Sequence, residues 1–513
     1  MSFFTLARSI YRRTLRRIKF IDQSGVIQAI KRANPTQSAA NHPAHQHIAP
    51  PGGRVWLKTY PLSNAELDTL NVLLQQLDIH LPAGELLDYL APLMTDGDVN
   101  LLVALLNFLT GQRTAQPRPS RVIRADELPS ALSAASVRLN ILFVTGEFPN
   151  PVHGGGGRVA DFIKVLSRHH NVYVYTVFDP DQDATAYEFL KPYCRNIQAI
   201  NEYQAFEGHP ERIRQFLAHL PDMDIVHYEW PRSLTNYDPA WGKRHLFTYM
   251  EAVSLRVWMD LRHRPPLSTD WLRKIVILIR SLKIELVDAA QIEALIAVTE
   301  QDANFLATLK SGGDYYVLNH GVDFDQFCLP DHPPEPEALA FVGHFLHYPN
   351  EDAMQFFFDK ILALIRKQVP GVKVYVVGAE PTAKIRSYHD GRQVIITGTV
   401  PDVRPYIQRA AVCIAPLITG AGLRSKVIQY AALRRACVAT SVAMIDLNLA
   451  DGQEVFIADD PNVFADKVVF LLQNPSVAER MAAAAYERVR CNYDTSKLTA
   501  QLYNIYTHLG VRQ

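Results

Sequence analysis

The stretch APLITGAGLRSKVIQYAALRRACVAT, residues 415–440, constrains the fold more than any other part of the chain. The apolar run Val412–Leu417 predicts a buried strand, and the small residues Thr419–Gly422 predict a turn. Arg424–Arg435 has apolar residues at helical spacing, and a second apolar run follows at Cys437–Ala439. A strand, a turn, a helix and a strand in this order form a βαβ unit with its two strands parallel in one sheet.

Two cationic side chains, Arg424 and Lys426, fall in the first turn of this predicted helix. Unpaired N–H groups and the helix dipole make a helix N-terminus attractive to anions, whereas cations there oppose the dipole. A phosphate ligand would account for both cations. Gln429 lies three residues beyond Lys426, on the same face of the helix. The alternative is the solvated first turn of an ordinary helix, which needs no ligand.

Length, charge and cysteine usage bound the class of protein. A chain of 513 residues is long enough for about two to four domains. Lys and Arg together number 52, as do Asp and Glu, and this neutral balance argues against nucleic-acid binding as the main task. The five cysteines are scattered without a CxxC pair, which is typical of a reducing cytosol. No run of 18 apolar residues occurs, so we expect a cytoplasmic protein without a transmembrane helix.

Apolar strands alternate with helical segments in two series, residues 136–330 and 331–513. The alternation predicts an α/β protein with two doubly wound, Rossmann-like domains that face a cleft. Ligands of such sheets bind at the carboxyl ends of the strands. The glycine-rich turns Gly154–Gly157 and Gly420–Gly422 both follow predicted strands, so we expect them to face each other across the cleft.

The first 135 residues lack this pattern and predict a mostly helical extension. Within residues 1–32, the segment 2–21 combines six basic side chains with apolar residues at helical spacing and has no acid. It favours binding to an anionic membrane surface, hence peripheral association with the inner face of the membrane; a transit peptide and a helix packed on the protein are the alternatives. Residues 33–135 are interpreted as a linker and a small helical module at 62–111, with a polar, Pro-bearing linker at 112–135.

Clustered acidic and histidine residues raise the question of a metal. Asp222-Met223-Asp224 and the run Asp179–Asp183 have the DxD look of metal-dependent transferases, but the adjacent Pro180 and Pro221 favour turns. Histidines 42, 45 and 47 have no nearby Cys or acid. We therefore expect no metal and no other cofactor.

Several stretches, taken in this order and spacing, resemble glycosyltransferase family 4 of the glycosyl transferases group 1, retaining enzymes of the GT-B fold. They are the glycine-rich turn at 153–158, DIVHYEW at 224–230, IAVTEQD at 296–302, LNHGVDFDQF at 318–327, FVGHFLHYPNEDA at 341–353, YVVGAEP at 375–381, TGTVPDVRPYI at 397–407, GAGLRSKVIQYAA at 420–432 and DDPNVFADKVVFLL at 459–472. The resemblance covers residues 138–508 and leaves the first part of the chain outside it.

The resemblance implies that a sugar nucleotide binds mainly on the second domain, with Arg424 and Lys426 on its diphosphate. The donor-binding set that it implies is Gly155, Gly156, Val400, Gly422, Arg424, Lys426 and Gln429, with the backbone of Val400 near the base. The E-x7-E pattern of the family is absent, because Ala421 and Gln429 occupy its two acidic positions. A glutamine accepts from one hydroxyl and donates to another, whereas an ionised glutamate accepts from two, so donor preference or activity is expected to differ.

The expected activity is retaining, hexosyltransferase-like transfer from a nucleoside-diphosphate sugar to a saccharide or lipid-linked acceptor, in polysaccharide or glycoconjugate synthesis. Front-face attack is the usual explanation of retention in this family and needs no protein nucleophile. The expected catalytic residues are therefore Glu251 as an acceptor contact, with Arg424 and Lys426 stabilising the leaving group. Arg256 is a weaker candidate, and a surface ion pair with Glu251 is the alternative.

Two other functions stay open at the level of the sequence. Ala421 and Gln429 also fit a non-catalytic sugar-nucleotide-binding or scaffold protein of the same fold. A third interpretation is a GT-B isomerase that acts on the sugar nucleotide itself.

Overall fold

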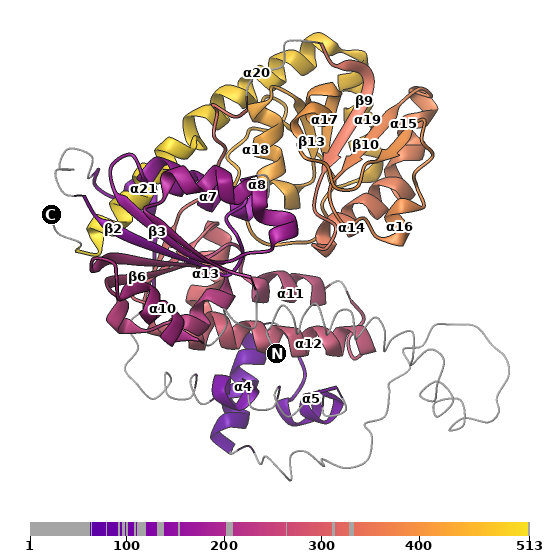
Figure 1. Ribbon diagram of the computed structural model, residues 1–513. Helices are drawn as coiled ribbons and strands as arrows, with labels where there is room; N and C mark the ends of the chain where they lie inside the picture. Colours follow the sequence, from indigo (N-terminus) through magenta and orange to yellow (C-terminus); the bar gives the residue numbers. More distant parts are fainter. Residues whose placement is uncertain are drawn as a thin grey trace, which may run out of the picture.

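The computed structural model describes residues 62–130 with several gaps, 138–201 apart from 152–153, 209–309 apart from His263, 313–327 and 333–510. Two parallel β-sheets, each flanked by helices, form its two domains (Figure 1). The predicted α/β fold with two doubly wound domains is confirmed. The basic segment 2–21 and the three clustered histidines lie outside the described residues.

The first sheet has the order β1-β8-β7-β6-β5-β2-β3-β4, and all neighbouring strands are parallel. Its direction of winding reverses between β2 and β5, where α/β folds usually bind ligands. The strands are β1 (Arg121–Arg124), β2 (Asn140–Thr145), β3 (Asn171–Val177), β4 (Asn196–Ile200), β5 (Met223–Glu229), β6 (Gly242–Tyr249), β7 (Ala294–Ala297) and β8 (Asp314–Val317).

Helices cover both faces of this sheet, because the crossover between parallel strands runs over a face. They are α7 (Gly154–Leu166), α8 (Pro180–Leu190), α10 (Pro210–Leu217), α11 (Val253–Leu261), α12 (Thr269–Leu282) and α13 (Glu300–Leu309). α12 continues into a π-helical turn, Lys283–Val287, and a 3-10 turn, Asp288–Gln291.

The second sheet has the order β11-β10-β9-β12-β13-β14, again all parallel, and its winding reverses between β9 and β12. Its strands are β9 (Glu335–Val342), β10 (Lys373–Val377), β11 (Val394–Ile396), β12 (Ala410–Ala415), β13 (Ala436–Ala439) and β14 (Phe456–Ile457). Its helices are α14 (Tyr348–Phe356), α15 (Leu362–Gln368), α16 (Ala383–Arg386), α17 (Arg404–Arg409), α18 (Ser425–Ala432), α19 (Pro461–Gln473) and α20 (Pro475–Asn492).

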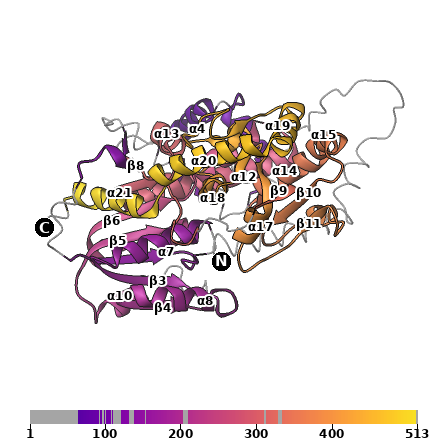
Figure 2. The same cartoon turned by 90° about the horizontal axis from the view of Figure 1, so that it is seen from above.

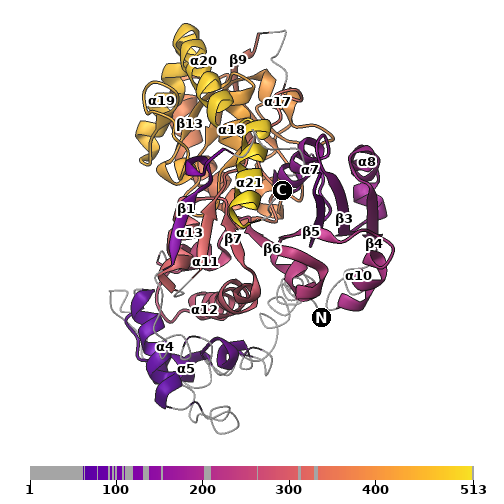
Figure 3. The same ribbon diagram turned by 90° about the vertical axis from the view of Figure 1, so that its left-hand side faces the viewer.

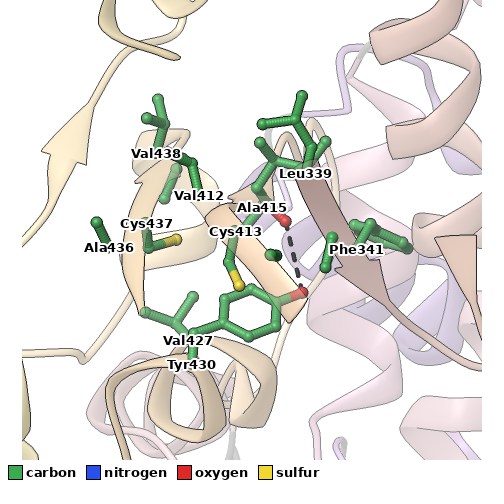
Figure 4. Close-up of a cluster of buried hydrophobic side chains, with 14 of the residues drawn as sticks. Leu339, Phe341, Val412, Cys413, Ala415, Val427, Tyr430, Ala436, Cys437 and Val438 are labelled. Atoms are coloured by element: carbon green, nitrogen blue, oxygen red, sulfur yellow. Dashed lines mark hydrogen bonds between the residues drawn. The ribbon is translucent and has the colours of Figure 1, made fainter. Parts of the chain in front are cut away.

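The core of the second domain joins α18 to the strands at its reversal point (Figure 4). Tyr430 of α18 is fully buried, and its hydroxyl accepts from the backbone N of Val342 at 2.9 Å and donates to the carbonyl of Ile414 at 3.5 Å. The hydroxyl therefore ties α18 to the ends of both β9 and β12. The position of the N-terminus of α18 is set by this packing.

The helical module α4 (Asn64–Gln76) and α5 (Ala83–Leu90) packs on the first domain beside α12 (Figures 1 and 3). Its leucines share one buried cluster with Ile275, Leu278 and Leu282 of α12. The indole N–H of Trp258 in α11 donates to the carbonyl of Leu77 at 2.6 Å. The extension is thus built onto the first domain over the described residues.

Two segments depart from the predicted domain organisation. Residues 112–135 were interpreted as linker, yet β1 pairs with β8 at the edge of the first sheet. α21 (Thr495–His508), the last helix, crosses back and buries Leu498, Leu502 and Tyr506 in the core of the first domain, beside α7 (Figures 1 and 2). Short edge strands and long-range docking leave little trace in local periodicity.

Candidate functional site

The carboxyl ends of the two sheets meet at the loop after β6 and the turn before α18. A β-carbon added to Gly422 would lie 3.0 Å from Cβ of Glu251 and 3.1 Å from the carbonyl oxygen of Met250. Gly422 has φ +75°, a conformation that favours glycine. Nε2 of His347, in the loop after β9, lies 3.3 Å from Oε2 of Glu251. The structure therefore brings Glu251 and Gly422 together across the domain interface.

Arg424 is the N-cap residue of α18, one position before the helix begins. Its guanidinium is buried and donates through Nη1 to the carbonyls of Ala421 and Gly422, the latter at 2.6 Å. Its Nε and Nη2 are buried without a hydrogen-bond partner among the described residues. Burial lowers the pKa of Arg424, while the nearby Glu251 and Asp302 act to raise it. Two buried donors without partners are costly, and an anion would satisfy them.

Lys426 is the second residue of α18 and is also buried. Its ammonium donates to Oδ1 of Asn350 at 2.6 Å and lies 4.0 Å from the centroid of the Phe341 ring. Burial lowers its pKa well below the ordinary value for lysine, and the charge of Arg424 lowers it further. Among the described residues no carboxylate lies within ion-pair distance of Arg424 or Lys426, so neither basic group at the start of α18 has a direct ion-pair partner there.

Glu251 is held as a carboxylate by the basic groups around it. Arg256 Nε donates to Oε1 at 3.0 Å, and His347 lies at Oε2. Burial acts to raise the pKa of Glu251, but the charges of Arg256, His347 and Arg424 outweigh it and lower the pKa. The alternative interpretation, an ion pair between Glu251 and Arg256, is therefore confirmed. The pair lies at the domain interface and not on an open surface. A strongly acidic carboxyl accepts hydrogen bonds but is a weak base.

Ala421, Gln429 and Val400 are the other positions that the sequence analysis singled out on the second domain. Ala421 is only 2% exposed and packs with the apolar cluster of the first domain, which explains why an acid is absent there. Gln429 is partly buried on α18, and Val400 is partly buried after β11, three strands along the sheet from β12. The ligand roles of Gln429 and Val400 stay predictions.

The glycines at 154–157 do not form the predicted turn. They form the first turn of α7, which begins at Gly154. A β-carbon on Gly156 would lie 2.8 Å from both N and O of Asn150, so Gly156 allows the helix to pack on its own preceding loop. The atoms nearest to a β-carbon on Gly155 would belong to Trp230 and Met250, at 3.5 Å or more. Gly155 therefore faces the domain interface and Gly156 faces its own domain.

The two DxD stretches serve the fold. Asp179 caps α8 by accepting from the N–H of Asp181, and Asp183 accepts from the N–H of Asp179 at 3.0 Å. Asp224 accepts from the N–H of Asn140 and from Lys243, at the start of β5 and so at the opposite edge of the sheet from the site. Neither stretch forms the turn that the neighbouring prolines suggested, because Pro180 is the first residue of α8 and Asp224 lies in β5.

Three site residues were missed by the sequence analysis: His347, Asn350 and Trp230. All three lie in the stretches that carry the family resemblance. The contacts of His347 and Asn350, however, are with partners 76 or more positions away in the sequence. The one signal available was their position after strands, since Trp230 directly follows β5 and the other two lie within eight residues of the end of β9. Among the described residues, no helix is long and apolar enough to cross a membrane.

Residues 336–474, which run from β9 to α19, match the family described as glycosyl transferases group 1. A trehalose synthase of Pyrococcus horikoshii is 25% identical over 197 residues, which cover 35% of this chain and 46% of that protein. An uncharacterised 44.6 kDa protein in the cps region of Klebsiella pneumoniae is 22% identical over 192 residues, or 36% of this chain and 48% of that protein. The chain thus spans about half the length of these curated relatives.

Solved structures share the arrangement of both domains. Sucrose-phosphate synthase of Thermosynechococcus elongatus superposes with a TM-score of 0.54 at 17% identity, over 72% of this chain and 99% of that one. Anabaena HepE, solved in complex with UDP and glucose, gives 0.52 at 12% identity, over 72% of this chain and 100% of that one. TarM gives 0.52 at 11% identity, over 73% and 99%. At these identities the likeness establishes the fold, and it confirms the predicted GT-B arrangement.

Proposed function

Residues 336–474 give this chain a glycosyl transferases group 1 domain, and on that premise we propose that the chain is a retaining glycosyltransferase. It moves a glycosyl group from a nucleoside-diphosphate sugar to a saccharide or lipid-linked acceptor, in polysaccharide or glycoconjugate synthesis. The observation that carries the proposal is the pair of buried cations at the start of α18, Arg424 and Lys426, neither of which has a carboxylate partner among the described residues.

The donor diphosphate supplies the charge that these cations lack. Nε and Nη2 of Arg424 donate to its oxygens, and Lys426 adds a second charge-assisted contact. The first N–H groups of α18 complete an anion site, since the N-terminus of a helix favours negative charge. The same groups stabilise the charge that develops on the departing diphosphate, which is where electrostatic catalysis acts.

Transfer then needs only positioning of the acceptor on the first domain. The bond from the anomeric carbon to the diphosphate oxygen breaks, and the bond to the acceptor oxygen forms on the same face. The acceptor proton passes to the leaving phosphate oxygen, so no protein base is required. Glu251, kept ionised by Arg256 and His347, accepts a hydrogen bond from the acceptor and orients it.

Calorimetry with UDP, ADP and GDP, each paired with its nucleoside, tests the diphosphate site. We expect Arg424→Ala to weaken the best diphosphate by about 10- to 100-fold, the range of one or two charge-assisted hydrogen bonds, while nucleoside affinity changes little. Arg392→Ala, at an exposed arginine of the same domain, is the matched control and should bind like wild type. Unchanged diphosphate binding in Arg424→Ala would contradict the assignment.

The scaffold alternative is favoured by one specific observation. Ala421 is packed into the first domain. The turn that carries it therefore offers no side chain to a bound sugar nucleotide at the position where the family has an acid. A scaffold would bind nucleotide sugars without consuming them. Chromatographic assay of the UDP-, ADP- and GDP-glucose pools separates the two functions, because release of the nucleoside diphosphate by wild type requires an enzyme.

A further inference from the structure

Trp230 has an unusual backbone conformation at the reversal point of the first sheet. It follows the last residue of β5 and has φ +64°, which is rare for a residue with a bulky side chain. Such a conformation is strained and persists only where the surrounding contacts enforce it, often at functional sites. The carboxyl ends of β2 and β5 are also the ligand-binding position of a doubly wound sheet.

The surroundings of Trp230 hold this conformation by several independent contacts. Its carbonyl accepts from the backbone N of Ser233 at 2.9 Å and from the hydroxyl of Ser233 at 2.8 Å. Gly146, after β2, donates to the carbonyl of Glu229 at 3.0 Å, and a β-carbon on Gly146 would lie only 3.3 Å from Cβ of Trp230. The next residue is Pro231, whose ring restricts the backbone further.

The indole of Trp230 lies beside the site and is not sealed into a core. Its Cζ2 and Nε1, together with Sδ of Met250, are the three heavy atoms nearest to a β-carbon built on Gly155. Met250 packs against the clusters of both domains and precedes Glu251. The indole is partly exposed, and its N–H makes no hydrogen bond to any residue that the structure describes. An aromatic face and a free donor therefore stand at the domain interface.

A buried network behind Trp230 fixes this arrangement. Glu229, the residue before it, is fully buried and accepts from Nη1 of Arg158 in α7 at 3.1 Å. Nε2 of His227 lies 3.3 Å from the same carboxylate, and Nδ1 of His227 lies 2.9 Å from the hydroxyl of Tyr506 in α21. The network therefore joins β5, α7 and α21. It fixes the position of Trp230 relative to Gly155.

We propose that Trp230 is the stacking platform for a pyranose ring of the acceptor, so that the acceptor is a saccharide. The inference rests on the proposed glycosyl transfer. The cations for the donor lie on the second domain, which leaves the aromatic face on the first domain for the acceptor. The electron-rich indole face attracts the C–H groups of a sugar ring, and the free indole N–H donates to a hydroxyl.

Tryptophan fluorescence of the full chain with saturating UDP tests the platform directly. Methyl β-D-glucoside and cellobiose are the ring-bearing probes, and glycerol is the probe without a ring. We expect the two sugars, and not glycerol, to change the emission of wild type. The chain has five tryptophans, so assignment needs variants. Trp230→Phe should lose the change, and the matched control Trp258→Phe, at a residue tied to Leu77, should keep it.

Initial rates of transfer to the same sugars supply the second readout. We expect Trp230→Ala to raise the acceptor KM about tenfold, or about 1.4 kcal/mol, and Trp230→Phe to raise it less because a ring remains. A wild-type acceptor KM in Trp230→Ala, a full emission change in Trp230→Phe, or no response of wild type to either sugar while UDP binds would overturn the proposal. If wild type binds none of the diphosphates, the proposed function itself fails.

Discussion

At the scale of single residues, Asp161 of α7 is a buried acid outside the site. Its Oδ2 accepts from the hydroxyl of Thr495, the first residue of α21, at 3.3 Å. Burial, and then the neighbouring charge of Asp323, raise the pKa of Asp161 to about 7. In the unfolded chain its pKa returns to about 3.8. The folded state therefore retains this proton over a range of pH in which the unfolded chain has lost it.

Asp161→Asn is expected to stabilise the protein above neutral pH. A raised folded-state pKa contributes stability below pH 3.8 that is lost as the pH rises through about 7. Asparagine keeps an acceptor for Thr495 and never ionises. We expect its advantage in the free energy of unfolding to grow from near zero at pH 4 to roughly 2–4 kcal/mol at pH 8, measured by thermal denaturation against pH. Glu188→Gln, at an exposed acid of α8, should show no such divergence, and parallel curves for Asp161→Asn would contradict the pKa assignment.

The basic residues of α18 show how far sequence reasoning reaches at this scale. The spacing placed Arg424 and Lys426 at the helix start correctly, because caps and first turns are local features. It did not predict that both are buried, because Asn350, which contacts Lys426, lies 76 positions away. The contact of His347 with Glu251 was not predicted for the same reason, because the two residues are far apart in the sequence.

At the scale of elements, the first turn of α7 has two adjacent glycines with opposite requirements. Gly156→Ala would place Cβ 2.8 Å from the backbone N and O of Asn150, whereas Gly155→Ala would leave ordinary contacts of 3.5 Å or more. Alanine favours helix over glycine by about 0.5–1 kcal/mol at either position. We expect Gly155→Ala to be neutral or stabilising and Gly156→Ala to lower the free energy of unfolding by about 1–3 kcal/mol, the usual cost of overpacking.

Chemical denaturation of the two variants side by side measures this difference, and each serves as the control of the other. Equal stabilities would show that the Asn150 loop moves away freely.

The predicted turn at the four glycines was wrong because glycine has a low intrinsic propensity for helix. Packing against the loop after β2 overrides that propensity. Strands with long apolar runs were predicted well, and the four-residue β1 and β8 were missed.

At the scale of the whole molecule, the two domains are joined by paired crossovers and a set of interface contacts. The backbone N of Val322 donates to the carbonyl of Tyr493 at 3.0 Å where the two crossing segments meet. A β-carbon on Gly321 would lie 1.8 Å from that same carbonyl oxygen, so only glycine fits. The carboxylate of Asp446, from the second domain, accepts from the N–H groups of Glu300 and Gln301 at the start of α13. Sequence periodicity predicted both domains but carried no information on these long-range contacts.

Gly422→Ala tests whether the contact between the domains at Glu251 is needed for transfer. The new Cβ would lie 3.0 Å from Cβ of Glu251 and 3.1 Å from the carbonyl of Met250, so the turn would have to withdraw from the first domain. Gly452→Ala is the matched control, because its φ of +77° is almost the same as the +75° of Gly422 and nothing lies within 4 Å of its Cβ position. Both variants thus bear the same backbone strain, about 1 kcal/mol, and only one obstructs the interface.

We expect kcat of Gly422→Ala to fall about tenfold or more relative to Gly452→Ala, since misplacing the acceptor side by a fraction of an ångström costs catalysis. The affinity for the diphosphate that wild type binds best should change less, because Arg424 and Lys426 stay on α18 with the second domain. Small-angle X-ray scattering with a saturating concentration of that diphosphate should show a larger radius of gyration for Gly422→Ala than for the control. If the two variants share the same kcat and the same scattering curve, Gly422 does not govern closure, and the approach of Glu251 to the start of α18 is not a requirement of the reaction.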